Sequence, residues 1–207
     1  AGAAVYEWDG STGFTPVGTV NSSAKLRGHF RSHNWSLDDE VLITDLEVAE
    51  VVKKWDGTTL ASVVFTNEAE APFGTFYAKY LRVTNERAIF ANVKDASGTS
   101  PHLIVGAKRG DYTVITVTDR PASSLSEEDP FFIPSPDLKT INGFEEAFGT
   151  AVLSTEQGAL FNLTGESAKD FAIDTFFAGS AASGDEAVAY IGNDIMYGRK
   201  GRIEGVR

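Results

Sequence analysis

The chain has 207 residues, no cysteine and a formal net charge of −11 at pH 7. The missing cysteines exclude disulfides and cysteine metal sites, and the excess of carboxylates argues against a protein that grips nucleic acid through lysine and arginine. Twenty glycines and 42% apolar residues, with no apolar run as long as a membrane span, indicate a turn-rich globular protein without a membrane partner.

Residues 1–35 begin with a strand that ends at Trp8, followed by an Asp9-Gly10 turn and a short strand around Phe14–Val17. Asp-Gly is typical of tight hairpin turns. An alternative to a purely structural turn is that Trp8 and Asp9 contact a carbohydrate. Further on, His29 and His33 are spaced like zinc ligands on a helix, but no third ligand accompanies them, so we predict no metal site.

The next predicted hairpin joins Val41–Thr44 to Val51–Trp55. The preceding Asp38-Asp39-Glu40 lacks the ligand spacing of a calcium loop and is interpreted as a solvated turn. A further hairpin joins Ala88–Ala91 to His102–Gly106, and Lys108 and Arg109 after it are expected to be surface charges.

Residues 119–137, DRPASSLSEEDPFFIPSPD, are predicted to be a long proline-rich loop with one helical turn from Ser126. Phe131, Phe132 and Ile133 are too apolar to remain in water. We therefore expect these three residues to anchor the loop or to contact a neighbouring subunit, and we take them as candidate assembly contacts.

The clearest hairpin lies at Ala151–Gly165, where strands Ala151–Thr155 and Ala159–Leu163 flank a turn that ends in Gly158. A last hairpin joins Asp194–Tyr197 to Gly201–Val206.

These hairpins recur at a regular spacing. Ile43, Phe90, Leu153 and Met196 are equivalent positions 47, 63 and 43 residues apart, and the longest interval contains the proline-rich run. A repeat of roughly 40 to 50 residues built of short strands is typical of β-propeller blades. The fold class predicted is therefore all-β, a propeller-like repeat of short antiparallel sheets that forms a single domain over residues 1–207. Because a closed ring needs roughly four to eight blades, we expect a fragment of a larger chain or one segment of a ring.

Several stretches, in order along the chain, resemble the propeller region of tail nozzle proteins of short-tailed bacteriophages. They are RAIFANVKDASGTSPHLIVGAKRGDYTVI, DPFFIPSPD, AVLSTEQGALFNL and IGNDIMYGRKGRIEGV. In that family an arginine-led strand, a Gly-Asp-Tyr turn, a Thr-Glu-Gly hairpin and an arginine-bearing strand follow in similar order.

The resemblance implies a structural component of the virion tail, without cofactor or catalysis. It implies a homo-oligomeric ring, a hexamer in that family, which contacts an adaptor and other tail proteins and through which viral DNA passes during genome ejection. The acidic charge then has two explanations, a wall along which DNA slides without sticking or simple solubility.

Two other classes of function stay open. A glycosidase would need two carboxylates facing each other in a cleft, and Glu145, Glu146, Glu156 and Asp170 are available for this role. A glycan- or receptor-binding propeller of a phage tail or a secreted bacterial protein could stack sugars on exposed aromatic residues. The candidates are Trp8, Trp35, Trp55 and Tyr112.

Overall fold

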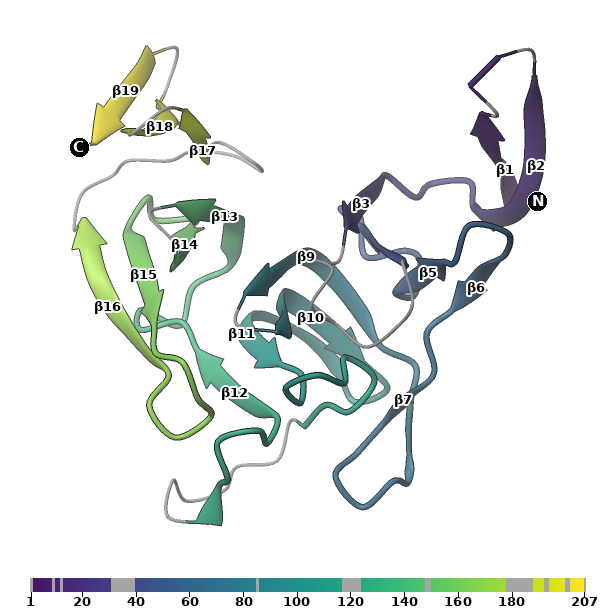
Figure 1. Ribbon diagram of the computed structural model, residues 1–207. Coiled ribbons are helices and arrows are strands. Elements are labelled where there is room, and N and C mark those ends of the chain that lie inside the picture. Colours follow the sequence, from purple (N-terminus) through teal and green to yellow (C-terminus); the bar gives the residue numbers. More distant parts are fainter. Residues whose placement is uncertain are drawn as a thin grey trace.

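The computed structural model describes residues 2–8, 10–11, 13–30, 40–84, 86–116, 124–147, 150–177, 188–191, 194–199 and 202–206. This part of the chain is all-β and forms six small antiparallel sheets, which are shown in Figure 1. No helix in it is long and apolar enough to span a membrane.

Three of the sheets have four strands, in the orders β3-β4-β5-β6, β12-β11-β10-β9 and β13-β14-β15-β16. The first contains β3 (Leu26–Phe30), β4 (Val41–Asp45), β5 (Lys53–Trp55) and β6 (Leu60–Ser62). The second contains β9 (Tyr77–Thr84), β10 (Arg87–Asp95), β11 (Gly98–Gly106) and β12 (Phe131–Pro134). The third contains β13 (Ile141–Ala147), β14 (Thr150–Thr155), β15 (Leu160–Thr164) and β16 (Ala172–Phe177).

The other three sheets are smaller. β1 (Gly2–Trp8) pairs with β2 (Phe14–Asn21), and β7 (Phe65–Thr66) pairs with β8 (Pro72–Gly74). At the C-terminal end, β17 (Val188–Ile191), β18 (Asp194–Arg199) and β19 (Arg202–Val206) form a three-stranded sheet.

The predicted hairpins are confirmed as pairs of neighbouring strands, β4 with β5, β10 with β11, β14 with β15 and β18 with β19. The four equivalent positions, Ile43, Phe90, Leu153 and Met196, all lie on the second strand of their sheets. The spacing of about 45 residues therefore corresponds to one sheet after the next, each a meander in chain order.

Local chemistry explains the Ala151–Gly165 hairpin. Gly158 has a φ of +81°, a conformation that glycine adopts without steric cost, and its N–H donates to the carbonyl of Thr155 at 2.7 Å. Alternation along β14 and β15 then leaves Leu153 and Phe161 opposite each other, and both are buried.

The sheets pack against one another in sequence through two hydrophobic cores. The first core joins the β3–β6 sheet to the β9–β12 sheet and centres on Phe65, Phe76 and Phe90, whose rings meet edge to face at centroid distances of 4.9 to 5.7 Å. The second core joins the β9–β12 sheet to the β13–β16 sheet. In Figure 1 the described sheets follow one another along an open arc, with β1–β2 and β17–β19 at its two ends.

The first strands of the three four-stranded sheets are joined by one ion network. Glu145 of β13 contacts Arg82 of β9 at 2.5 Å and Arg27 of β3 at 3.0 Å. Arg27 and Arg82, which lie far apart in the sequence, thus both bind a carboxylate of a third sheet. This network places β3, β9 and β13 on a common side of the stack.

Three sequence interpretations are wrong, in whole or for part of their range. Phe131–Pro134 are strand β12 rather than loop, because they add to the free edge of β11 with Phe132 opposite Val105. Glu40 is buried rather than solvated, since Lys54 Nζ and the Tyr112 hydroxyl donate to its carboxylate at 2.8 and 2.6 Å. No helical turn starts at Ser126, where the chain bends over residues 127–129 instead. Residues 31–39 and 117–123, which hold other parts of these predictions, lie outside the described residues.

Candidate functional site

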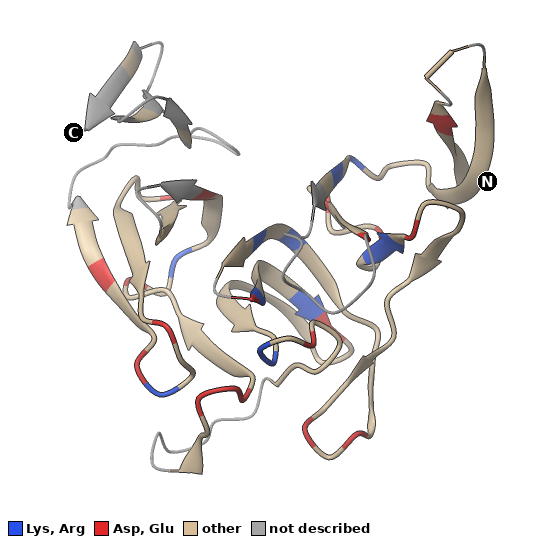
Figure 2. Cartoon of the chain, viewed as in Figure 1, with Lys and Arg blue, Asp and Glu red and all other residues tan. Residues whose placement is uncertain are grey.

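Three loops that carry several carboxylates form an edge of the described chain, which we call the acidic edge. Figure 2 shows carboxylates at the turn between β7 and β8, at the bend before β12 and at the loop between β15 and β16. The β15–β16 loop adjoins the bend before β12, because Ala168 N–H donates to the Glu127 carbonyl at 3.2 Å, and that bend lines one pocket together with the β7–β8 turn. The acidic edge consists of Glu68, Glu70, Glu127, Glu128, Asp129, Glu166 and Asp170.

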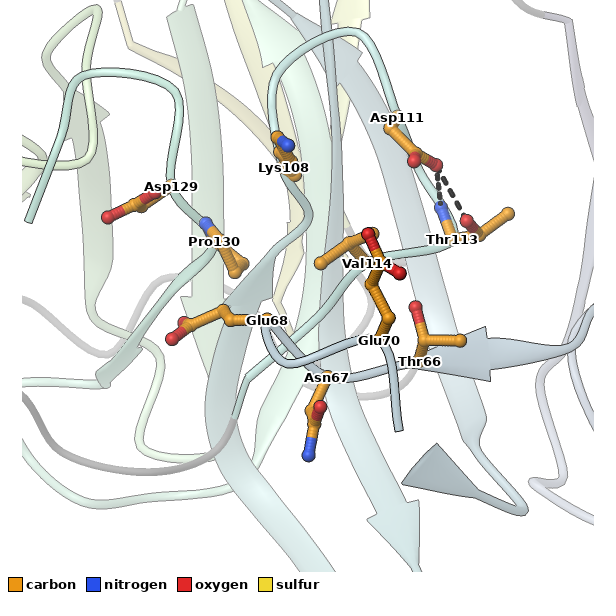
Figure 3. Close-up of a pocket in the computed structure, with 10 residues that line it drawn as sticks. All are labelled: Thr66, Asn67, Glu68, Glu70, Lys108, Asp111, Thr113, Val114, Asp129 and Pro130. Carbon is orange, nitrogen blue, oxygen red and sulfur yellow. Dashed lines mark hydrogen bonds between the residues drawn. The ribbon is translucent and has the colours of Figure 1, made fainter. Parts of the chain in front are cut away.

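A polar pocket of about 300 Å³ opens within this edge (Figure 3). Its walls are the β7–β8 turn, the segment 108–114 that follows β11, and the bend before β12. These walls are tied together by backbone hydrogen bonds, from Thr66 N–H to Thr113 O at 2.9 Å and from Ile115 N–H to Thr66 O at 3.0 Å. The pocket residues are Thr66, Asn67, Glu68, Glu70, Lys108, Asp111, Thr113, Val114, Asp129 and Pro130.

Two polar side chains of the pocket accept hydrogen bonds from groups of the turns to which they belong. Asp111 accepts from the N–H and the hydroxyl of Thr113 at 3.0 and 2.6 Å, and Asn67 accepts from the N–H groups of Ala69 and Ala71 at 2.9 and 3.0 Å. Four of the residues that line the pocket carry carboxylates and one, Lys108, carries an ammonium group, so the pocket has a negative potential. Within the described ranges no three His, Cys, Asp or Glu side chains are grouped as a metal site would require.

Arg87 fixes the backbone of the central loop of the acidic edge. Its side chain is fully buried at the start of β10, where Nη1 donates to the carbonyl of Asp129 at 2.7 Å and Nη2 to that of Glu127 at 2.8 Å. Nη1 also contacts the carbonyls of Ala107 and Glu128. Burial, and secondarily the positive charge of Arg109, lowers the pKa of Arg87 to about 10, so it remains charged at neutral pH. A buried cation therefore holds this acidic loop against the second sheet.

The candidate assembly contacts Phe131, Phe132 and Ile133 pack inside the chain. The Phe131 ring stacks on Phe171 at a centroid distance of 4.3 Å and lies directly over Gly106, where any side chain would collide with it. Phe132 and Ile133 pack against the first and second cores, respectively. These contacts support the anchoring alternative. A subunit contact through the three side chains stays a prediction, and Phe131 has only 4% of its surface left for one.

The carboxylates considered for glycoside hydrolysis have structural partners or lie apart. Glu145 is bound by two arginines. Asp170 accepts hydrogen bonds from the backbone N–H and from the hydroxyl of Ser167, and these bonds lower its pKa. Glu156 is exposed at the β14–β15 turn, where its N–H donates to Thr140. The side chain of Glu146 lies outside the described part. Among the candidates whose side chains are described, Glu145 and Asp170 are thus engaged in structural contacts rather than free for catalysis.

Among the aromatic candidates, Tyr112 is buried in the first core and bound to Glu40, so it is not available to sugars. Trp55 is half-buried and Trp8 is exposed, whereas Trp35 lies outside the described residues. His33 and the side chain of His29 are also outside the described part. Lys108 and Arg109 are surface charges as predicted, and Arg109 pairs with Glu86 at 3.1 Å.

Sequence reasoning missed the role of Arg87 and the buried carboxylates of Glu40 and Asp45. Asp45 accepts four backbone N–H groups around the β4–β5 connection, those of Lys25, Glu47, Ala49 and Glu50. The one sequence signal for the buried position of Arg87 is that it stands directly before the apolar run of β10.

Comparison with models of protein families gives no match for this chain, and comparison with curated proteins gives none either. The resemblance to tail nozzle proteins therefore enters below as a proposal.

Proposed function

We propose that this chain is a structural component of a bacteriophage tail, a nozzle or tail-tube protein whose sheets are blades of a propeller-like ring. The observation that carries the proposal is the repeated unit, three four-stranded meanders in chain order, each packed on the next. Their first strands share the Arg27–Glu145–Arg82 network. Successive small sheets with their first strands on one side are the arrangement expected of blades around an axis.

The acidic edge supports passage of DNA rather than its retention. Seven carboxylates along these loops repel phosphates, and one cation near them, Arg109, is engaged in an ion pair with Glu86. Proteins bind DNA by releasing counterions to lysine and arginine, which requires the opposite charge. In the proposed role the carboxylates line a path along which the genome moves without being held.

Electron microscopy of the purified chain, combined with light scattering, tests the ring. We expect closed rings with a central opening and a mass that is a multiple of 22.2 kDa. A chain that stays monomeric up to roughly 100 μM, far above the concentrations at which stable interfaces assemble, would refute the ring.

Binding of double-stranded DNA tests the role of the charge. The native chain should not shift DNA in a gel at low salt, whereas replacing Glu68, Glu70, Glu127 and Glu128 by lysine should produce salt-dependent binding. A matched control carries four lysines at carboxylates away from the acidic edge, Glu7, Asp95, Asp137 and Glu156. Equal DNA binding by both variants would mean that only net charge matters and that the acidic edge has no special part.

A further inference from the structure

The β1–β2 hairpin presents a row of aromatic side chains to solvent. Trp8 lies directly opposite Phe14, and Tyr6 directly opposite Pro16. Opposite residues, and alternate residues along one strand, project to the same side of a sheet, so these four side chains share one face. We call Tyr6, Trp8, Phe14 and Pro16 the aromatic face.

This face is not covered by the rest of the chain in the described structure. Tyr6, Trp8 and Phe14 are 56%, 62% and 72% exposed, and they are three of the seven large apolar side chains that are exposed in the described part. The other end of the hairpin joins the body, where Gly18 lies against Leu60 of β6 and Val20 is buried. Figure 1 shows the hairpin projecting from the end of the arc.

The size of the aromatic face suits a small flat ligand better than a stable protein interface. An aromatic side chain buries roughly 150 to 250 Å² when fully covered, so three that are already partly covered offer about 400 Å². A stable protein interface buries about 800 Å² on each partner. A second copy of this chain docked on the hairpin alone would therefore bind weakly.

The charge of the hairpin restricts the chemical class of the ligand further. Its charged residues, Glu7 and Asp9, are both acidic, and the whole chain carries −11. Phosphate polymers and anionic bilayers would both be repelled. An anionic ligand is thereby disfavoured, and a flat, neutral group that can lie on aromatic rings fits this face.

We propose that the aromatic face binds a neutral polysaccharide through stacked hexopyranose rings. The C–H groups on one side of a pyranose ring make an apolar surface that matches an indole or phenyl ring, and the ring hydroxyls stay in water. The Tyr6 hydroxyl supplies a hydrogen-bonding group on the same face. The stacking residues are Trp8 and Phe14, with Tyr6 extending the row by one strand repeat, about 7 Å along the hairpin. This inference does not depend on the tail function proposed above.

A glycan array of neutral and charged polysaccharides, followed by calorimetric titration with the best oligosaccharide, tests the proposal. We expect binding to at least one neutral glycan, which Trp8→Ala and Phe14→Ala each weaken about tenfold or more. Thr15→Ala is the matched control, because Thr15 is exposed on the opposite face of the same hairpin, across from Glu7. It should change affinity by less than about twofold, since a surface substitution without a ligand contact has little effect.

Three results would overturn the proposal. The first is an array with no neutral glycan bound, and the second is binding that Trp8→Ala and Phe14→Ala leave unchanged. The third is self-association of the native chain in analytical ultracentrifugation that Trp8→Ala abolishes, which would assign the aromatic face to a second copy. Thermal unfolding of each variant within a few degrees of the native chain shows that loss of binding is not loss of the fold.

Discussion

The guanidinium carbon of Arg87 lies 5.5 Å from the centroid of the Phe131 ring, so the first residue of β10 touches the first residue of β12. Phe131 stacks on Phe171, from the loop before β16, and the guanidinium is also 5.8 Å from that second ring, so it lies beside both rings. A buried cation, two stacked rings and the backbone of the acidic bend therefore form one unit between the second and third sheets.

Replacing Arg87 by methionine should lower the free energy of unfolding by about 2 to 4 kcal/mol. The variant keeps an apolar side chain of similar length but removes the donors to the carbonyls of Glu127 and Asp129, and polar groups that are left buried without partners are costly. Urea denaturation at pH 7 measures the difference. The control is Arg109→Met, whose exposed pair with Glu86 should contribute less than about 1 kcal/mol. Equal effects at both positions would show that the hydrogen bonds from Arg87 to the acidic loop add no stability.

Replacing Phe131 by alanine should destabilise the fold itself by roughly 3 to 5 kcal/mol, the range measured for large aromatic deletions in cores. The reason is its burial against Phe171 and Gly106, and the same reasoning makes Phe132→Ala less harmful, because Phe132 is only partly buried. Unfolding curves of the two variants and of Val64→Ala, at a residue that is 74% exposed, give the comparison. If Phe131→Ala were as stable as the native chain and altered only its assembly, the subunit-contact alternative would be right.

The sequence was informative about the hairpins because their signals are local. Gly158 at the turn and the alternation on either side of it are enough to place β14 and β15, and the same pattern recurs at the second strand of each sheet. Strand pairing between neighbours in the chain needs no information from elsewhere.

The contacts between sheets could not be predicted, because they join residues that share no local pattern. Arg87 binds the carbonyl of a residue 40 positions away, and Arg27 binds Glu145 at a separation of 118. The prolines around Phe131–Ile133 favour a loop in the sequence, although a short edge strand that begins after one proline and ends at another is compatible with both. The sequence shows the members of the aromatic face only as separate residues. Their placement on one face depends on the register of β1 with β2.

Replacing Glu145 by glutamine should destabilise the chain by about 2 to 3 kcal/mol. Loss of the carboxylate removes a counter-charge from Arg82, which is buried, and weakening the pairing of a buried charge is expensive. A double-mutant cycle should give a larger coupling energy between Glu145 and Arg82 than between Glu145 and Arg27, since Arg27 is more exposed. Glu86→Gln is the matched control, at an exposed pair. Additive effects at Glu145 and Arg82 would mean that the network does not join the sheets energetically.

The stability supplied by Asp170 should disappear in acid. Hydrogen bonds from the backbone and the hydroxyl of Ser167 lower the pKa of this carboxyl below 3.8, its ordinary value. A carboxyl whose pKa is lower in the folded state favours folding at pH values above its unfolded pKa, and this contribution is lost as the pH falls through the folded pKa. The native chain should therefore exceed Asp170→Asn in stability at pH 6, and the difference should shrink as the pH falls through the folded pKa of Asp170.

Asp56 provides an independent instance of the same effect in another sheet. The N–H groups of Thr59 and Thr58 donate to its carboxylate at 2.7 and 2.9 Å and lower its pKa, so Asp56→Asn should show the same dependence on pH. Urea denaturation of both variants and the native chain at several pH values between about 2 and 6 measures the trend, and the linkage relation fixes its sign. A stability difference that grows as the pH falls would mean that these carboxyls are more easily protonated in the folded chain, opposite to what their hydrogen bonds require.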